Sequence, residues 1–176
     1  ATIKAGGFSA LKATLKVLSG HEDRAMRERF EGLKSYPAGS FGKAYADFIE
    51  INQFDFPGTP GGPPPPVFRH DCCHVLGGYG TTAAEEGAVV GFQAGFEGLD
   101  PFDVILFVMA EFELGIGVSP FIPGEWRQLD PDRIFAGLEH GSHVSCNLIK
   151  DIDPWTHFAE PLEDVRQRFS IPARGR

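Results

Sequence analysis

Nine of the ten residues from 57 to 66 are proline or glycine, and this segment constrains the fold more than any other part of the chain. Proline has a fixed φ and no backbone N–H, so the segment can form neither the interior of a helix nor a strand inside a sheet. We expect an extended linker or a stiff surface loop here, which separates an N-terminal helical part from the rest of the chain.

Outside this segment, apolar residues recur at helical spacing. Phe8, Leu11, Leu15 and Leu18 predict a helix that ends near Gly20. No segment alternates as a half-buried strand does, and no internal repeat is present. The prediction is an all-α fold, a single domain over residues 1–176 built as a helical bundle with proline- and glycine-rich loops. Further helices are expected over 22–34, from 41 onwards, over 68–76, 82–96 and 102–114, and after 131 and 161.

The charge and cysteine content exclude several functional classes. Sixteen Lys and Arg stand against 24 Asp and Glu, a formal net charge of -8, which disfavours a nucleic-acid-binding surface. The longest strongly apolar run, residues 104–110, is too short to span a bilayer. Three cysteines do not form a disulfide framework, and this indicates a reducing compartment. No secretory signal or Arg-rich transit peptide is evident, so we expect a cytoplasmic protein.

A segment with metal-binding character follows the proline-rich loop. His70 and His74 are one helical turn apart and project from the same face. Asp71 is at i+3 from His74, so the three side chains can converge on one ion at the edge of the helix. Two imidazoles and a carboxylate within five residues are ligands for zinc or another first-row divalent metal.

A fourth ligand can come from the next helix. Glu86 would be about 18 Å from His74 on one straight helix, but the glycines in residues 77–80 allow the chain to reverse. Thr82 and Glu85 have the spacing of a capping box, which would turn Glu85 back towards Thr82 and leave Glu86 free to coordinate. Residues 67–96 are thus expected to form a metal-binding helix-turn-helix.

The same region offers candidates for a substrate groove. Gly87, Gly91 and Gly95 recur every four residues, a pattern that indicates either close packing of a neighbouring helix or an open groove for a ligand. The helix over 102–114, which includes Phe107, is apolar on nearly every face, so it should be buried or lie against a hydrophobic ligand.

Two other residue groups have two interpretations each. Cys72 and Cys73 point away from the histidine face, and buried packing is favoured over metal or redox chemistry. His140 and His143 belong either to a helix end near Gly141 or to a second ion site.

At the residues described above, the sequence resembles the ubiquinone (coenzyme Q) biosynthesis protein 4 family. The family signature is His-Asp-x-x-His, eleven residues and Glu, which reads here as His70, Asp71, His74 and Glu86. Residues 75–81 resemble the continuation of the signature. Two outlying stretches, 42–48 and 161–166, extend the resemblance to about residues 40–171. Glu85 stands where the family tends to have glycine.

The resemblance implies an all-α fold and a metal held by His70, Asp71, His74 and Glu86, which would also be the catalytic residues. The metal is usually taken as Zn²⁺, with Fe²⁺, Mn²⁺ or Mg²⁺ as alternatives. The implied reaction replaces the C1 carboxyl group of a polyprenylated aromatic quinone precursor by a hydroxyl, an oxidative decarboxylation. The implied partners are other quinone-biosynthesis enzymes and the inner face of a membrane, and a homodimer is compatible with this interpretation.

Two other functional classes remain open from the sequence. One is a prenyl-lipid-binding or scaffold protein of the quinone biosynthetic complex in which the metal is structural. The other is a metal-dependent hydrolase with a His-Asp doublet. A hydrolase of that kind needs further ligands, for which His140, His143 and Asp103 are weak candidates.

Overall fold

The computed structural model describes residues 22–118 and 124–174. The helix predicted through Phe8 and Leu18 lies outside these residues. Within the described ranges the chain forms helices and two isolated β-bridges but no strand, so the all-α prediction is confirmed. The elements are α2 (Arg24–Glu31), η1 (Gly32–Ser35), α3 (Phe41–Ile51), α4 (Pro65–Gly77), α5 (Ala83–Glu97), α6 (Pro101–Val108), η2 (Met109–Glu113), α7 (Pro131–Ser142), η3 (Pro154–Thr156) and α8 (Leu162–Arg168).

Side-chain caps fix where several helices begin. The Ser40 hydroxyl accepts a hydrogen bond from the Lys43 N–H at 3.2 Å and starts α3. Asp100 and Asp130 cap α6 and α7 in the same way, each directly before a proline at the first helical position. Helix α4 ends at Gly78, whose φ of 74° is a left-handed conformation that glycine adopts without strain.

The proline- and glycine-rich segment 57–66 is a packed loop as far as Pro64. Helix α4 begins at Pro65, inside this segment. The carbonyl of Gly58 accepts a hydrogen bond from the Asp23 N–H at 2.9 Å. A Cβ at Gly58 would meet the Asp23 carbonyl oxygen at 2.5 Å, so the close approach itself requires a glycine. The segment is therefore a stiff loop docked on the start of α2.

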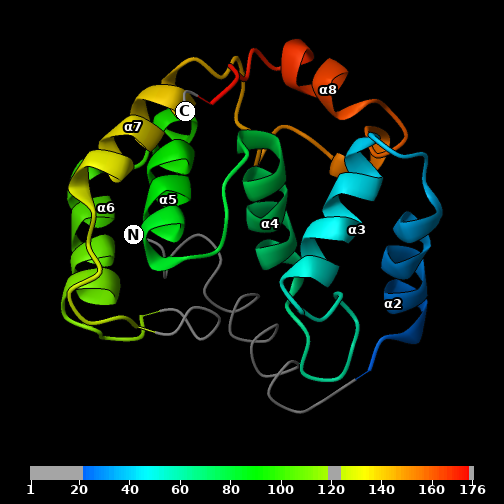
Figure 1. The fold of residues 1–176 in the computed structure, drawn as a ribbon, viewed down its shortest axis with the longest axis horizontal. Coiled ribbons are helices and arrows are strands. Elements are labelled where there is room, and N and C mark those ends of the chain that lie inside the picture. The colour runs from blue at the N-terminus through cyan, green and yellow to red at the C-terminus, as the bar shows by residue number, and fades with distance from the viewer. Residues whose placement is uncertain (1–21, 119–123, 175–176) are drawn as a thin grey trace.

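The helices pack in a chain of neighbours (Figure 1). Helix α3 packs against α4, α4 packs against α5, and α5 contacts both α6 and α7. An aromatic core fills the α2–α4 side, where Phe30, Tyr45, Phe68 and Phe158 lie with ring centroids 4.9–6.0 Å apart. This core holds α4, the helix that carries the two predicted histidine ligands.

Helix α6 is buried on one side only. Val108, with Phe112 of the π-helical turn η2, packs in a second, small core with Ala83. Phe102 and Leu106 point outwards and are 69% and 58% exposed. Burial on nearly all faces is therefore wrong for the outer face of α6, whereas the alternative, a helix that lies against a hydrophobic ligand, stays a prediction. None of the helices in the described ranges is long and apolar enough to cross a membrane.

Candidate metal centre

His70 and His74 lie one turn apart on α4, and their rings meet at their Nε2 atoms. The two Nε2 atoms are 3.0 Å apart and the ring planes are at 85°. His74 is buried and stacks on the ring of Phe48, whereas His70 is half-buried. The four-residue spacing thus places the two imidazoles on one face of the helix, as helical geometry requires.

A hydrogen bond on the far side of each ring fixes its tautomer. His74 Nδ1 lies 2.9 Å from the carbonyl oxygen of Gly80, which can only accept, so Nδ1 carries the hydrogen. His70 Nδ1 lies 2.9 Å from Oε1 of Gln93, and the Gln93 amide nitrogen is directed to the Cys73 sulfur. Both Nε2 atoms therefore present a lone pair to the space between the rings.

Glu86 brings a carboxylate to the same point from the first turn of α5. The chain leaves α4 at Gly78, reverses, and lays α5 against α4. Glu86 Oε2 is then 3.4 Å from His70 Nε2 and 3.5 Å from His74 Nε2. The ligand atoms of these three residues all lie within 4.8 Å of one another.

The donor set fits a divalent metal ion. Two imidazole lone pairs and a carboxylate that face one another need a cation or a proton between them. A tetrahedral ion with bonds of about 2.0–2.1 Å keeps its ligand atoms roughly 3.3 Å apart, close to the 3.0–3.5 Å measured among the three atoms. Two nitrogens and one oxygen suit zinc and other first-row divalent ions alike.

The electrostatics of the group favour a positive charge at its centre. Burial raises the pKa of Glu86, but hydrogen bonds and charge from His70 and His74 outweigh burial and hold this pKa at about 2. Burial lowers the pKa of His70, but the hydrogen bond and charge of Glu86, with Gln93 and Asp71, raise it above its ordinary value. A proton and a metal ion therefore compete for the same position.

Asp71 does not belong to the group of converging ligand atoms. The sequence predicts four ligands, and the structure brings three of them together. Asp71 follows His70 by a helical step of about 100°, and its carboxylate oxygens do not join the ligand atoms of His70, His74 and Glu86 that lie within 4.8 Å of one another. It is buried and lines the adjacent cavity. Burial and the charge of Glu86 raise its pKa to about 7, against the opposing effect of His70.

The predicted capping box at the start of α5 is wrong. The Thr82 side chain makes no capping hydrogen bond. Glu85 accepts a hydrogen bond from the Gly80 N–H at 3.1 Å and pairs with Arg133 and Arg174, which are 48 and 89 residues away. Hydrogen bonds from Arg174 and from the Gly80 N–H, together with the charges of Arg174 and Arg133, outweigh burial and hold the pKa of Glu85 at about 2.

The three-residue group opens into a cavity of about 720 Å³, a volume typical of small-molecule sites. Its other polar lining residues are Gln53, Asp55, Asp71, Gln93 and Asp103. Phe107, a predicted groove residue, also lines the cavity. The apolar residues of the cavity come from four parts of the chain: Phe54, Val67, Val90, Leu99, Val104 and Phe107.

The glycine stripe of α5 does not form a ligand groove. A Cβ at Gly91 would lie 2.1 Å from the Ile134 carbonyl oxygen, and one at Gly95 would lie 2.5 Å from the Leu138 carbonyl oxygen. A Cβ at Gly87 would meet the Ile134 side chain at 3.2 Å. The groove prediction for these three residues is wrong because α7 occupies the space, and the alternative of close helix packing is confirmed. Two glycines of α7 face α5 in return: Gly137 and Gly141.

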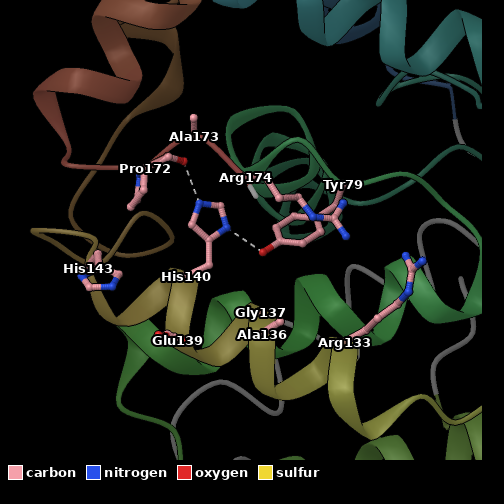
Figure 2. A pocket seen from close by; sticks show the side chains of 10 residues that line it. All are labelled: Tyr79, Arg133, Ala136, Gly137, Glu139, His140, His143, Pro172, Ala173 and Arg174. Atoms are coloured by element: carbon pink, nitrogen blue, oxygen red, sulfur yellow. Dashed lines mark hydrogen bonds between the residues drawn. The ribbon is translucent and has the colours of Figure 1, made fainter. Parts of the chain in front are cut away.

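A second cavity, of about 400 Å³, lies between α7 and the C-terminal segment (Figure 2). His140 donates from Nε2 to the Pro172 carbonyl at 2.9 Å and accepts at Nδ1 from the Tyr79 hydroxyl at 2.7 Å. Burial lowers the pKa of His140. Across residues 22–118 and 124–174, His140 and His143 join no group of three metal-ligand side chains. The second-ion alternative therefore gains no support.

Cys72 and Cys73 are buried in the main core, and Cys146 is also free. Burial raises the pKa of both buried thiols. The interpretation of this pair as packing residues is confirmed.

Two residues of the site were not predicted from the sequence. Gly80 and Gln93 accept the Nδ1 hydrogens of the histidines. Gln93 follows Glu86 by seven residues, or two helical turns, so a polar residue on the same face was a signal that could have identified it. Gly80 acts through its carbonyl, for which no side-chain signal exists.

Comparison with known proteins gives a fold but no family. No family model and no curated protein matches the chain. Among solved structures, the chain is similar to a crystal structure from Nostoc punctiforme PCC 73102 that is provisionally named a ubiquinone biosynthesis protein. The TM-score is 0.54 at 18% identity, over 92% of this chain and 82% of that chain. At this identity, the likeness shows a shared fold.

Proposed function

We propose that the protein is a metal-dependent enzyme of quinone biosynthesis that replaces a ring carboxyl group of a polyprenylated aromatic precursor by a hydroxyl. One observation carries the proposal. A group of His70, His74 and Glu86 lines a cavity whose remaining side chains are mostly apolar, although Gln53, Asp55 and Asp103 also line it. A substrate with a carboxylated phenol at one end and an isoprenoid chain at the other matches this division. The resemblance of the motif and the fold of the Nostoc structure support the same substrate class.

The ligand count favours catalysis over a structural metal. Structural zinc sites are closed by four protein ligands, whereas catalytic sites keep a position for water or substrate. Among the described residues three side chains converge, which leaves such a position, and all three residues line the cavity. This favours the enzyme over the scaffold protein with a structural metal.

The residues of the chain would orient and enclose the substrate. A bound divalent cation supplies positive charge that stabilises the negative charge that develops as CO₂ leaves. Gly80 and Gln93 hold the two imidazoles in the tautomer that presents Nε2 to the cavity. Asp71 would offer a carboxyl beside the aromatic ring of the substrate. Apolar lining residues such as Phe107 would exclude water from around its isoprenoid tail.

The reaction balances with dioxygen as the oxidant. The bond between ring carbon and carboxyl breaks, CO₂ leaves, and a carbon–oxygen bond forms at the same ring position. For a para-hydroxy acid, one acid and one dioxygen give one quinone, one CO₂ and one water. A two-electron reductant then converts the quinone to the hydroquinone, in which a hydroxyl stands in place of the carboxyl.

A prenylated substrate resides in a membrane, and we propose that the outer face of α6 contacts that membrane. Phe102, Ile105 and Leu106 are exposed there, and Val104 and Phe107 of the same helix line the cavity. Residues 99–118 contain no Lys or Arg, so this face of α6 offers no cation to anionic lipid headgroups. Replacing Phe102 and Leu106 by Ser should abolish binding to neutral phosphatidylcholine vesicles, and undiminished binding would contradict this role.

The enzyme proposal is tested with metal-loaded protein and a prenylated para-hydroxybenzoate under air. We expect CO₂ release and a product with oxygen at the former carboxyl position, identified by mass spectrometry. Asp71→Asn should keep its metal and lose about 10²- to 10⁴-fold in turnover, as removal of a catalytic acid or base does. Loss of the metal in Asp71→Asn would instead make this residue a ligand. Tight binding of the prenylated acid without turnover would contradict the enzyme and favour the lipid-binding scaffold.

A further inference from the structure

The backbone of Gly80 connects the metal centre to an ion-pair cluster on the other side of the helix reversal. Its carbonyl accepts the Nδ1 hydrogen of His74 at 2.9 Å. Its N–H donates to Oε2 of Glu85 at 3.1 Å. Both backbone polar groups of Gly80 are thus hydrogen-bonded. The carbonyl is bonded to His74, a predicted metal ligand, and the N–H is bonded to Glu85, the residue before the ligand Glu86.

Glu85 is itself held by two cations from distant parts of the chain. Arg133 comes from α7 and Arg174 from the C-terminal segment (Figure 2). Arg174 also stacks on the ring of Tyr79, with 4.4 Å from its guanidinium carbon to the ring centroid, and donates to the Gly78 carbonyl at 3.1 Å. The turn between α4 and α5 is therefore fixed from outside by α7 and by the C-terminal segment.

Glu85 and Glu86 are adjacent in sequence, about 100° apart around α5, and their carboxylates have different partners. The Glu86 carboxylate faces the two Nε2 atoms, and the Glu85 carboxylate faces the two arginines. Because His74 takes its orientation from the Gly80 carbonyl, any shift of Gly80 changes where His74 Nε2 points. Hydrogen-bonded partners behind a metal ligand set its tautomer and ring orientation, and their loss weakens metal binding.

We infer that Glu85, fixed by Arg133 and Arg174, is a positioning residue that holds His74 in its metal-binding orientation through Gly80. The inference rests on the proposed metal site. It extends that site to Arg174, one hundred residues beyond His74 in the sequence, although the side chains of Glu85 and Arg174 bond to other partners than the metal ligands.

The experiment compares Glu85→Ala with a matched control, Glu160→Ala. Glu160 is also a carboxylate with two partners, His157 and Arg168, but it lies outside the metal-binding group and its cavity. Two quantities are measured for each protein. One is the affinity for Zn²⁺, by competition with a chromogenic chelator. The other is the tautomer of His74 in the metal-free protein, from nitrogen-15 NMR.

We expect Glu85→Ala to bind Zn²⁺ about tenfold more weakly than the wild type, at the lower end of the effect of outer partners of metal ligands. His74 should lose its uniform Nδ1–H tautomer, and Glu160→Ala should change neither quantity. Equal affinities in the two variants, or an unchanged His74 tautomer in Glu85→Ala, would overturn the inference.

Two further results keep the test decisive. If Glu85→Ala does not fold, Glu85→Gln takes its place, since it keeps an oxygen for the Gly80 N–H but loses the charge that pairs with the arginines. Its Zn²⁺ affinity should lie below that of Glu160→Gln, and equal values would overturn the inference. If the wild type binds no metal, the proposed function fails, whereas the His74 tautomer still tests the positioning role of Glu85.

Discussion

The two faces of α5 are built on different principles. One face carries Glu86 and Gln93 into the cavity, where each side chain contacts a histidine of α4. The other face carries Gly87, Gly91 and Gly95 against the backbone of α7. The function of the first face depends on the chemistry of its side chains. The packing of the second face depends on glycines, which have no side chain to keep α7 away. Substitutions on the first should therefore affect the metal, and substitutions on the second should affect the fold.

The largest effect is expected at Gly91. A Cβ there would lie 2.1 Å from the Ile134 carbonyl oxygen, and backbone on both sides leaves no flexible atom to move. Gly91→Ala should reduce the free energy of unfolding by at least about 3 kcal/mol, measured by urea denaturation. Gly32→Ala is the control, because Gly32 is exposed, helical and open around its Cβ position. It should stabilise by about 0.4–1 kcal/mol. A Gly91→Ala protein as stable as the wild type would contradict the close contact with α7.

The next effect concerns Gln93 on the functional face. Gln93→Leu removes the acceptor of the His70 Nδ1 hydrogen but keeps a side chain of similar size. Metal affinity should fall about 10- to 100-fold while the cooperative unfolding transition is retained. Gln167→Leu, on the exposed surface of α8, is the control and should leave metal affinity unchanged. If both variants bind metal like the wild type, Gln93 does not support His70.

The pH dependence of metal binding sharpens the comparison further. His70 must be neutral to bind a metal, and its pKa in the metal-free protein lies above the ordinary value of 6.5. Affinity should therefore fall about tenfold per pH unit below that pKa and level off above it, because one proton competes with the ion. Metal titrations from weakly acidic to weakly alkaline pH test this, and a constant affinity would contradict it.

The source of this pKa can be tested separately. Glu86 supplies the largest of the effects that raise the pKa of His70. Glu86→Gln should therefore lower the pKa of His70 in the metal-free protein, which an NMR titration measures. An unchanged His70 pKa in Glu86→Gln would show that the carboxylate does not interact with the ring.

Local spacing was enough to predict the helices and the centre of the site. The separation of His70 from His74 defines one helix face, and the glycines before Thr82 allow the reversal that brings Glu86 to it. Both features lie within 17 residues, from 70 to 86, so the sequence shows them directly.

The errors concern partners that are distant in the sequence. The Glu85 carboxylate leaves Thr82 because Arg133 and Arg174 are near it in the fold. The glycines of α5 are covered because α7, which follows later in the chain, packs against them. The sequence of α5 alone does not distinguish helix packing from a ligand groove. Asp71 has the spacing of the family signature, but its carboxylate does not join the converging ligand atoms. Spacing along the sequence does not fix the direction of a side chain.

The most direct test of the account is the metal content of the purified protein beside two variants, Glu86→Gln and Glu160→Gln. Both lose one carboxylate charge, but only Glu86 faces the two histidines. The account predicts about one divalent ion per chain in the wild type and in Glu160→Gln, and little or none in Glu86→Gln. Equal metal content in all three proteins, or no metal bound by the wild type after incubation with zinc or ferrous iron, would contradict it.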